Sequence, residues 1–182
     1  EGDASGRSLA SNLNLDFRWL HNTAWVYWQL LDPAGGWGLL TMDADKRQLG
    51  YANNKWFVLA QYSRHIRRGF TIIDGGDANT IAALDRRGKT LVLVSTNYNS
   101  GTAAATYNLS AFAAGKGGEC TRWTTSFESS GEQYTEHRDC ALSASGGALV
   151  LNATLPSQAV TTFELRGIEA AGLAGWAGQQ RR

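Results

Sequence analysis

Charge and long apolar runs are both scarce in this sequence. Only 18% of its 182 residues are charged, and the net charge is +1. We therefore expect neither nucleic acid nor an anionic membrane as a partner, because both would need a strongly basic surface. No apolar run approaches the length of a bilayer span. The hydrophobic fraction of 43% is typical of a globular chain, and the length suits one ordinary domain with a sizeable core.

Cysteine and histidine are also few. Cys120 and Cys140 could form one disulfide in an oxidising compartment, but a lone pair of cysteines is equally compatible with free thiols. The histidines, at positions 21, 65 and 137, have no metal-ligand spacing with the cysteines. We therefore expect no metal and no cofactor.

The chain lacks an initiator methionine, and Glu1-Gly2-Asp3 is too polar for a signal peptide. We expect that processing or truncation has removed the true beginning. Seven tryptophans and six tyrosines among abundant Ser, Thr and Gly are typical of secreted carbohydrate-active proteins. Asn108 and Asn152 fit the N-glycosylation sequon, a triplet that is also common by chance. The predicted location is therefore extracellular.

Aromatic residues concentrate between positions 23 and 40. Residues 24–31 are apolar on both faces, which predicts a strand buried inside a parallel sheet. The strand runs into Asp32-Pro33 and a Gly-Gly turn, and ligands bind at that end of parallel strands. Trp28 and Trp37 could therefore stack on a sugar ring, or both could simply belong to the core.

Two helices are predicted around this strand. Residues 5–20 carry Leu9, Leu13 and Phe17 at helical spacing. A second helix spans residues 54–66, and Gly69 is placed to end it. Its exit carries four cationic or titratable side chains: Arg64, His65, Arg67 and Arg68. Such a cluster could bind an anion, but complementing the helix dipole is the simpler explanation.

After residue 71 the pattern changes to short strands. Residues 80–84 and 90–96 flank a hairpin turn at 85–88, where Gly88 is available for positive φ. Four more strands are predicted, at 104–109, 120–127, 148–154 and 159–165. Such strands predict an antiparallel β-sandwich over residues 71–166, with a tail at 167–182 that we expect to be disordered.

One buried parallel strand between two helices cannot satisfy its own edges or cover both of its apolar faces. No other βα unit is present in the sequence. Residues 1–70 are therefore expected to be the end of a larger α/β barrel.

Several motifs resemble those of glycoside hydrolase family 30, in particular its fungal endo-β-1,6-galactanases. In this family the second helix and its exit follow the pattern Tyr/Phe-Ser-Lys/Arg-x-Ile-x-x-Gly. The resemblance extends from about residue 2 to residue 166. The motifs that carry it are GDASG at 2–6, WVYWQLLDP at 25–33, GGW at 35–37, FVLAQYSRHIRRG at 57–69 and TRWTTS at 121–126.

The resemblance implies a (β/α)8 TIM barrel joined to a side β-sandwich. Residues 1–70 would supply helix 7, strand 8 and helix 8, so the fold class is α/β plus all-β. It also implies a retaining glycosidase, which uses two carboxylates about 5–5.5 Å apart. In the family these follow barrel strands 4 and 7, and both would precede this chain. Glu1 is a weak candidate for the nucleophile, and no catalytic residue is otherwise expected here.

Trp28 matches the family's eighth-strand Trp, which lines the sugar subsite nearest the scissile bond. Gln29 and Trp37 are its neighbours and are further substrate-binding candidates, whereas Trp25 is expected to pack in the core. The remaining carboxylates are expected to be solvated; they are Asp32, Asp43, Asp45, Glu128, Glu132 and Glu136.

The leading hypothesis is a C-terminal fragment of a secreted endo-β-1,6-galactanase-like hydrolase, which acts on β-1,6-linked galactan side chains. Its partners would be the polysaccharide and the missing N-terminal barrel portion, and the isolated chain should be inactive. One alternative is a carbohydrate-binding module with Trp123 or Tyr134 as its platform. Another is a purely structural sandwich that supports the barrel.

Overall fold

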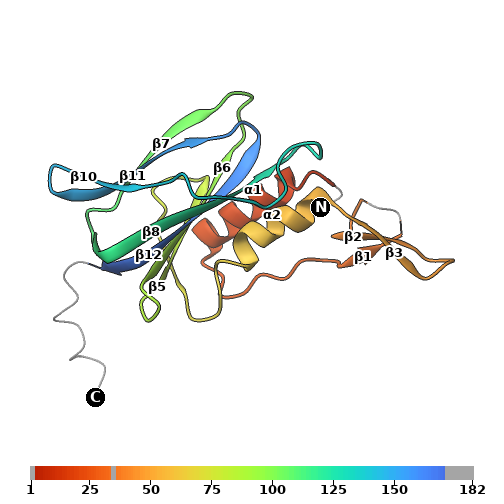
Figure 1. Ribbon diagram of the computed structural model, residues 1–182. Helices are drawn as coiled ribbons and strands as arrows, with labels where there is room; N and C mark the ends of the chain where they lie inside the picture. Colours follow the sequence, from red (N-terminus) through yellow and green to blue (C-terminus); the bar gives the residue numbers. More distant parts are fainter. Residues whose placement is uncertain (1–2, 34–35, 171–182) are drawn as a thin grey trace, which may run out of the picture.

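A computed structural model describes residues 3–33 and 36–170 of the chain. The described part is mostly β, with two α-helices at one side (Figure 1). The helical elements are α1 (Arg7–Leu15), which continues into the π-helix η1 (Asp16–Leu20), and α2 (Asn54–Ser63). The strands are β1 (Leu31–Asp32), β2 (Leu40–Asp43), β3 (Gln48–Ala52), β4 (Thr71–Ile73), β5 (Thr80–Asp85), β6 (Thr90–Asn97), β7 (Ala103–Asn108), β8 (Phe112–Ser126), β9 (Thr135–His137), β10 (Leu142–Ser145), β11 (Ala148–Leu155) and β12 (Ala159–Ala170).

The central layer is a six-stranded sheet in the order β4-β5-β6-β12-β8-β9. Because side chains alternate along a strand, its two faces serve two separate cores. Ile81 and Val160 point toward α1 and α2, whereas Leu93 and Phe163 point toward the three-stranded sheet β10-β11-β7. The described part of the chain thus has three layers, with two antiparallel sheets around the second core.

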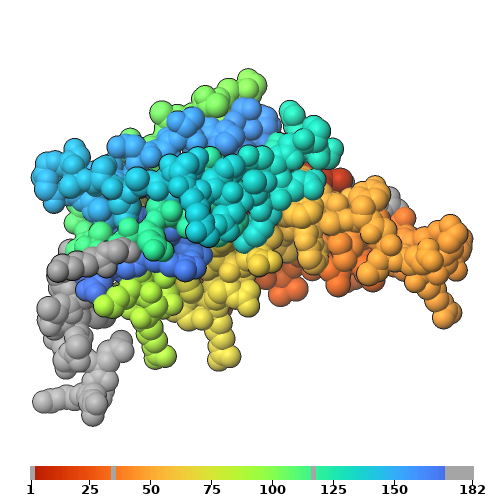
Figure 2. Space-filling view, viewed as in Figure 1, coloured from red at the N-terminus to blue at the C-terminus, as the bar shows by residue number. Residues whose placement is uncertain are grey.

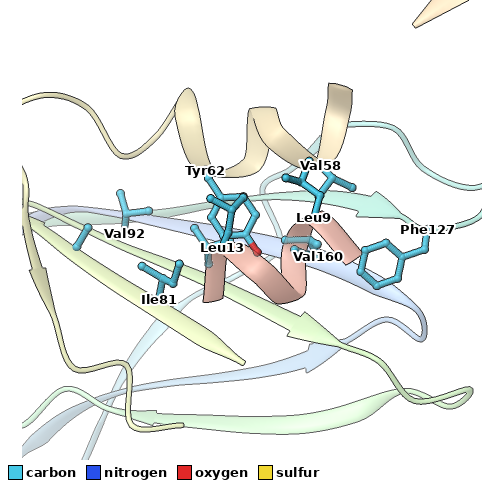
Figure 3. Close-up of a cluster of buried hydrophobic side chains, with 11 residues drawn as sticks. Leu9, Leu13, Val58, Tyr62, Ile81, Val92, Phe127 and Val160 are labelled. Atoms are coloured by element: carbon cyan, nitrogen blue, oxygen red, sulfur yellow. The ribbon is translucent and has the colours of Figure 1, made fainter. Parts of the chain in front are cut away.

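The two helices pack closely on each other and on the sheet (Figure 3). Leu9 and Leu13 of α1 join Val58 and Tyr62 of α2 in one buried cluster. At the start of α1, Gly6 has φ +82°, and an added Cβ would lie 2.7 Å from the Val58 side chain. Glycine therefore permits both the turn and the close approach of the helices. Both predicted helices are present, but α2 ends at Ser63 and not at residue 66, so Gly69 does not terminate it. The predicted boundary at residues 68–71 falls in the connection between α2 and β4.

The β5–β6 hairpin is confirmed, with Leu84 opposite Leu91. Its turn differs from the prediction, because the positive φ lies at Lys89 (+52°) and not at Gly88. Glycine is required at position 88 for lack of space, because an added Cβ would approach Asp85 Oδ2 to 2.4 Å. The Asp85 carboxylate accepts the Arg87 N–H at 3.0 Å and so occupies the space beside the turn.

Strand β12 extends beyond its predicted end at residue 165. A β-bulge at Gly167, where φ is +71°, lets the strand continue to Ala170, and Ile168 is buried in the second core. Residues 167–170 are therefore sheet and not tail, because the apolar Ile168 side chain finds a place in that core. Residues 171–182 lie outside the described part of the chain.

The third sheet, β1-β2-β3, lies beyond the two helices and projects from the body of the molecule (Figures 1 and 2). β1 is parallel to β2, with Leu31 opposite Leu40, and β2 is antiparallel to β3. The predicted strand over residues 24–31 is wrong for most of its length, because only Leu31 falls in a strand. A strand that is apolar on both faces needs parallel neighbours, and within the described residues only β2 supplies one.

Candidate substrate-binding surface

The segment before β1 runs past the helices toward β1 (Figure 1), and along residues 25–30 half-buried and exposed side chains alternate. Trp25 and Tyr27 pack against the core of the helices, and Trp25 Nε1 donates to Asp16 Oδ2 at 2.8 Å. Their neighbours point outward: Val26 is 88% exposed and Trp28 is 69% exposed. Packing of Trp25 is as expected, whereas the burial predicted for both faces is not observed.

The substrate-binding candidates lie on one connected piece of backbone. Gln29 is half-buried, and its carbonyl accepts the N–H of Leu39 at 3.1 Å. The carbonyl of Leu30 accepts the N–H of Leu40 at 2.9 Å. These bonds join the segment that carries Trp28 to the loop that carries Trp37, whose indole is half-exposed.

A group of buried polar side chains surrounds the Trp37 loop, and sequence reasoning did not find it. Asp32 was expected to be solvated, yet its carboxylate is buried and accepts the Trp37 N–H at 2.8 Å. Lys55, in the first turn of α2, is fully buried. A lysine near a helix start is usually solvated, so no sequence pattern signals its burial.

Apolar exposure is confined to one part of the described chain. The large hydrophobic side chains exposed there all lie between residues 15 and 56: Leu15, Trp19, Leu20, Val26, Trp28, Leu30, Trp37, Leu49, Tyr51 and Trp56. The described sheets β4–β12 contribute none of them. Exposed large apolar side chains gathered in one stretch of the chain indicate a binding or contact surface, since soluble proteins rarely leave contiguous apolar patches open to water.

The four side chains predicted together at the exit of α2 are separated in the structure. His65 turns into the sheet, and Arg64 lies over the Tyr134 ring with its guanidinium carbon 5.2 Å from the centroid. Arg67 and Arg68 line a different feature, a cavity of about 1000 Å³ between η1, the end of α2 and β4. They therefore do not form a single anion site.

His65 forms a buried relay with Glu164 of β12 and with Tyr134, which immediately precedes β9. Its Nδ1 lies 2.9 Å from Glu164 Oε2, and its Nε2 lies 2.8 Å from the hydroxyl of Tyr134. Since a carboxylate only accepts, Nδ1 carries the proton that is donated to Glu164. The ring of Trp123 packs on His65 with centroids 4.4 Å apart. Part of the ring surface of both Trp123 and Tyr134 is therefore covered by contacts within the protein.

This relay predicts that the stability of the fold depends on pH. The hydrogen bond from His65 holds the pKa of Glu164 below its ordinary value, against the burial that would raise it. The stabilisation is therefore present above the ordinary glutamate pKa and is lost as the pH falls through the lowered native pKa. The free energy of unfolding, measured with urea, should fall between pH 7 and pH 3 by about 1 kcal/mol less in Glu164→Gln than in the wild type. The exposed Glu128→Gln is the control, and equal pH profiles for the two variants would contradict the prediction.

Cys120 and Cys140 form a disulfide, with their Cα atoms 5.5 Å apart. The pairing that the sequence left open is thus present in the structure. The two sulfurs cross-link β8 to the segment that precedes β10.

The two sequon asparagines lie on one exposed face of the sheet β10-β11-β7. Asn108 and Asn152 are both exposed, on β7 and β11 respectively. Asn152 Oδ1 accepts the hydroxyl of Thr106, its cross-strand neighbour, at 2.9 Å. The positions are accessible, and their glycosylation stays a prediction.

Most of the other carboxylates singled out in the sequence lie at the surface in the described part of the chain. Glu1 lies outside the described residues. Asp43 pairs with Lys46 at 2.9 Å on the β2–β3 hairpin, and Asp45, Glu128, Glu132 and Glu136 are exposed. Within residues 3–33 and 36–170, no group of three or more His, Cys, Asp or Glu side chains could hold a metal ion. No helix in these ranges has the length and apolarity to cross a membrane.

Known proteins resemble the chain in both sequence and fold. An endo-β-1,6-galactanase of Hypocrea rufa is 42% identical over 170 residues, which cover 92% of this chain and 34% of the relative. A family 30 subfamily 8 xylanase of Clostridium acetobutylicum superposes with a TM-score of 0.66 at 22% identity, over 91% of this chain and 40% of that one. The catalytic domain of a family 30 xylanase of Talaromyces cellulolyticus gives 0.64 at 18% identity, over 91% and 36%.

No protein-family profile matches the chain. The chain spans about a third of the galactanase and about 40% of the Clostridium acetobutylicum xylanase. At these identities the xylanases establish the fold alone. The resemblance predicted from the motifs is therefore confirmed: the chain is similar in sequence to part of an endo-β-1,6-galactanase and in fold to part of the glycoside hydrolase family 30 enzymes.

Proposed function

We propose that this chain is the C-terminal portion of a retaining glycoside hydrolase that cleaves β-1,6-linked galactan. The observation that carries the proposal is the 42% identity to an endo-β-1,6-galactanase across 92% of this chain. Because the chain spans 34% of that relative, the rest of the enzyme would be a longer N-terminal portion.

The exposed apolar surface supports a role as the end of a barrel. In this proposal α1 with η1 is helix 7, residues 24–31 are strand 8, and α2 is helix 8 of a (β/α)8 barrel. Val26 and Leu30 would then contact the N-terminal barrel portion, which is the expected partner. The segment 24–30 forms no strand by itself because its parallel neighbours would come from that portion.

In the proposed enzyme this chain binds and orients the sugar. The exposed indole of Trp28 would receive the apolar face of a pyranose ring, and Gln29 and Trp37 would line the same cleft. The nucleophile and the acid/base would come from the N-terminal portion. They would act in two steps, with a covalent glycosyl-enzyme intermediate and net retention. By itself the chain is expected to bind sugar but not to hydrolyse it.

The sandwich, residues 71–166 in this proposal, would support the barrel, since α1 and α2 share a core with the central sheet. Secretion is proposed as well, because a disulfide is stable in an oxidising compartment.

A reducing-sugar assay on β-1,6-galactan tests the division of labour. The purified chain should release no reducing ends, because both proposed catalytic carboxylates lie outside it. Turnover by the chain alone would overturn the proposal that it lacks them.

Affinity electrophoresis in β-1,6-galactan separates the three hypotheses. Retardation that is lost in Trp28→Ala and kept in Trp123→Ala supports the barrel cleft. The reverse result supports a binding module on the sandwich, where Trp123 is half-buried beside Tyr134. No retardation of the wild-type chain supports a purely structural role and contradicts the proposed sugar-binding face.

A further inference from the structure

Side chains hold the backbone of residues 36–38 at each peptide. The Trp37 N–H donates to Asp32 Oδ2 at 2.8 Å, and the Trp37 carbonyl accepts the hydroxyl of Tyr27 at 2.8 Å. The Gly38 carbonyl accepts Asn53 Nδ2 at 2.7 Å. Main-chain groups in a surface loop commonly bond to water, so a loop satisfied by side chains in this way is strongly constrained.

The fourth contact is made by a buried cation. Lys55 Nζ donates to the carbonyl of Gly36 and lies 5.5 Å from the centroid of the Tyr27 ring. Lys55 is 0% exposed. Burial of an ammonium group is unfavourable unless the group is well bonded. The bond to the Gly36 carbonyl therefore ties Lys55 closely to the loop.

Close packing also restricts the conformation of the loop. An added Cβ on Gly38 would lie 2.7 Å from both the Cβ and the backbone nitrogen of Asp32. The next residue, Leu39, bonds to the carbonyl of Gln29 and accepts from the N–H of Asn53 at 2.8 Å. The loop, the segment of Trp28 and the start of α2 therefore form one hydrogen-bonded frame.

The indole of Trp37 contrasts with this frame, because 49% of Trp37 is exposed to solvent. A ring on a rigid backbone requires little further ordering of the backbone when a ligand stacks on it. We propose that Tyr27, Asp32, Asn53 and Lys55, here called the loop clamp, are positioning residues that hold Trp37 as a preformed stacking face for a pyranose ring. This inference rests on the proposed function and adds the residues that set the affinity of that site.

The test uses the intact chain with a β-1,6-linked galactotriose as probe. Trp37→Ala should raise the Kd because the stacking face is removed. Asp32→Asn and Tyr27→Phe keep the indole but loosen its backbone, so each should raise the Kd about fivefold to tenfold. Hydrogen exchange of the Trp37 amide should accelerate about tenfold in Asp32→Asn, since this amide loses its carboxylate acceptor.

Matched controls separate positioning from general destabilisation. Asp43→Asn makes the same chemical change as Asp32→Asn on the neighbouring hairpin. Lys55→Met, which removes the bond to the Gly36 carbonyl and should also raise the Kd, has Lys46→Met as its control. Neither control should alter the Kd. Tyr27→Phe removes only a hydroxyl, so it keeps the test valid even if Asp32→Asn or Lys55→Met does not fold.

The outcomes distinguish the two proposals. A wild-type chain that binds no galactotriose contradicts the proposed function. Wild-type binding with an unchanged Kd in both Tyr27→Phe and Asp32→Asn overturns the loop clamp alone. Weakened binding in the clamp variants but not in Asp43→Asn, with cooperative thermal unfolding retained, supports it.

Discussion

Replacement of Phe163 by alanine is expected to lower the free energy of unfolding by about 3–5 kcal/mol. Phe163 is 0% exposed and lies on β12, the strand that joins β6 to β8 in the central sheet. Its ring packs against Tyr107 of the opposing sheet, with centroids 5.7 Å apart. The substitution would leave a cavity between two sheets, and hydrogen-bonded strands on both sides of β12 resist collapse into it.

Urea or guanidinium unfolding of the purified chain measures this effect. The denaturant slope should stay unchanged while the midpoint falls. Phe70→Ala is the matched control, because Phe70 is only half-buried against the helix core and should lose clearly less. A loss below about 1 kcal/mol for Phe163→Ala would contradict the assignment of Phe163 to a tightly packed core.

Removal of the disulfide should have the second largest effect. Cys120 and Cys140 are separated by 20 positions, and closing a loop of this length restricts the unfolded chain by about 3 kcal/mol. The double variant Cys120→Ser/Cys140→Ser should therefore melt at a lower temperature than the oxidised wild type. The cross-link also holds the segment before β10 near β8 in the folded chain. Part of the lost stability therefore comes from contacts of the native state.

Reduction provides an internal control for this prediction. Dithiothreitol should lower the melting temperature of the wild type toward that of the double variant, and it should leave the double variant unchanged. An equal effect of dithiothreitol on both proteins would show that the shift does not come from the disulfide.

Local patterns predicted those parts of the fold that depend on near neighbours. The helical spacing of Leu9 and Leu13 predicted α1, and the turn after Asp85 predicted the β5–β6 hairpin. The short strands β4, β9 and β10 were missed, because their residues are mostly exposed or half-buried and carry little alternation. β12 was predicted too short because the residues from 167 onward show no clear period, whereas in the sheet a bulge at Gly167 lets the strand continue.

The candidate site was predicted only in part. Trp28 and Trp37 were proposed as sugar-binding residues from their order along the chain and from the family resemblance. The groups that hold Trp37 were not, because Asp32 and Lys55 approach the loop from separate elements. The His65–Glu164 contact joins residues 99 positions apart, and no spacing rule reaches across that distance.

The sequence by itself determined which segments become helices and central strands, and its motifs determined the family resemblance. Both depend on the order of neighbouring residues, through side-chain periodicity and turn chemistry. Only the tertiary structure decided that Cys120 and Cys140 pair, that Lys55 is buried and that Trp28 faces solvent. These outcomes depend on which distant surfaces meet and which remain uncovered, and burial and pairing are properties of the packed chain rather than of any segment.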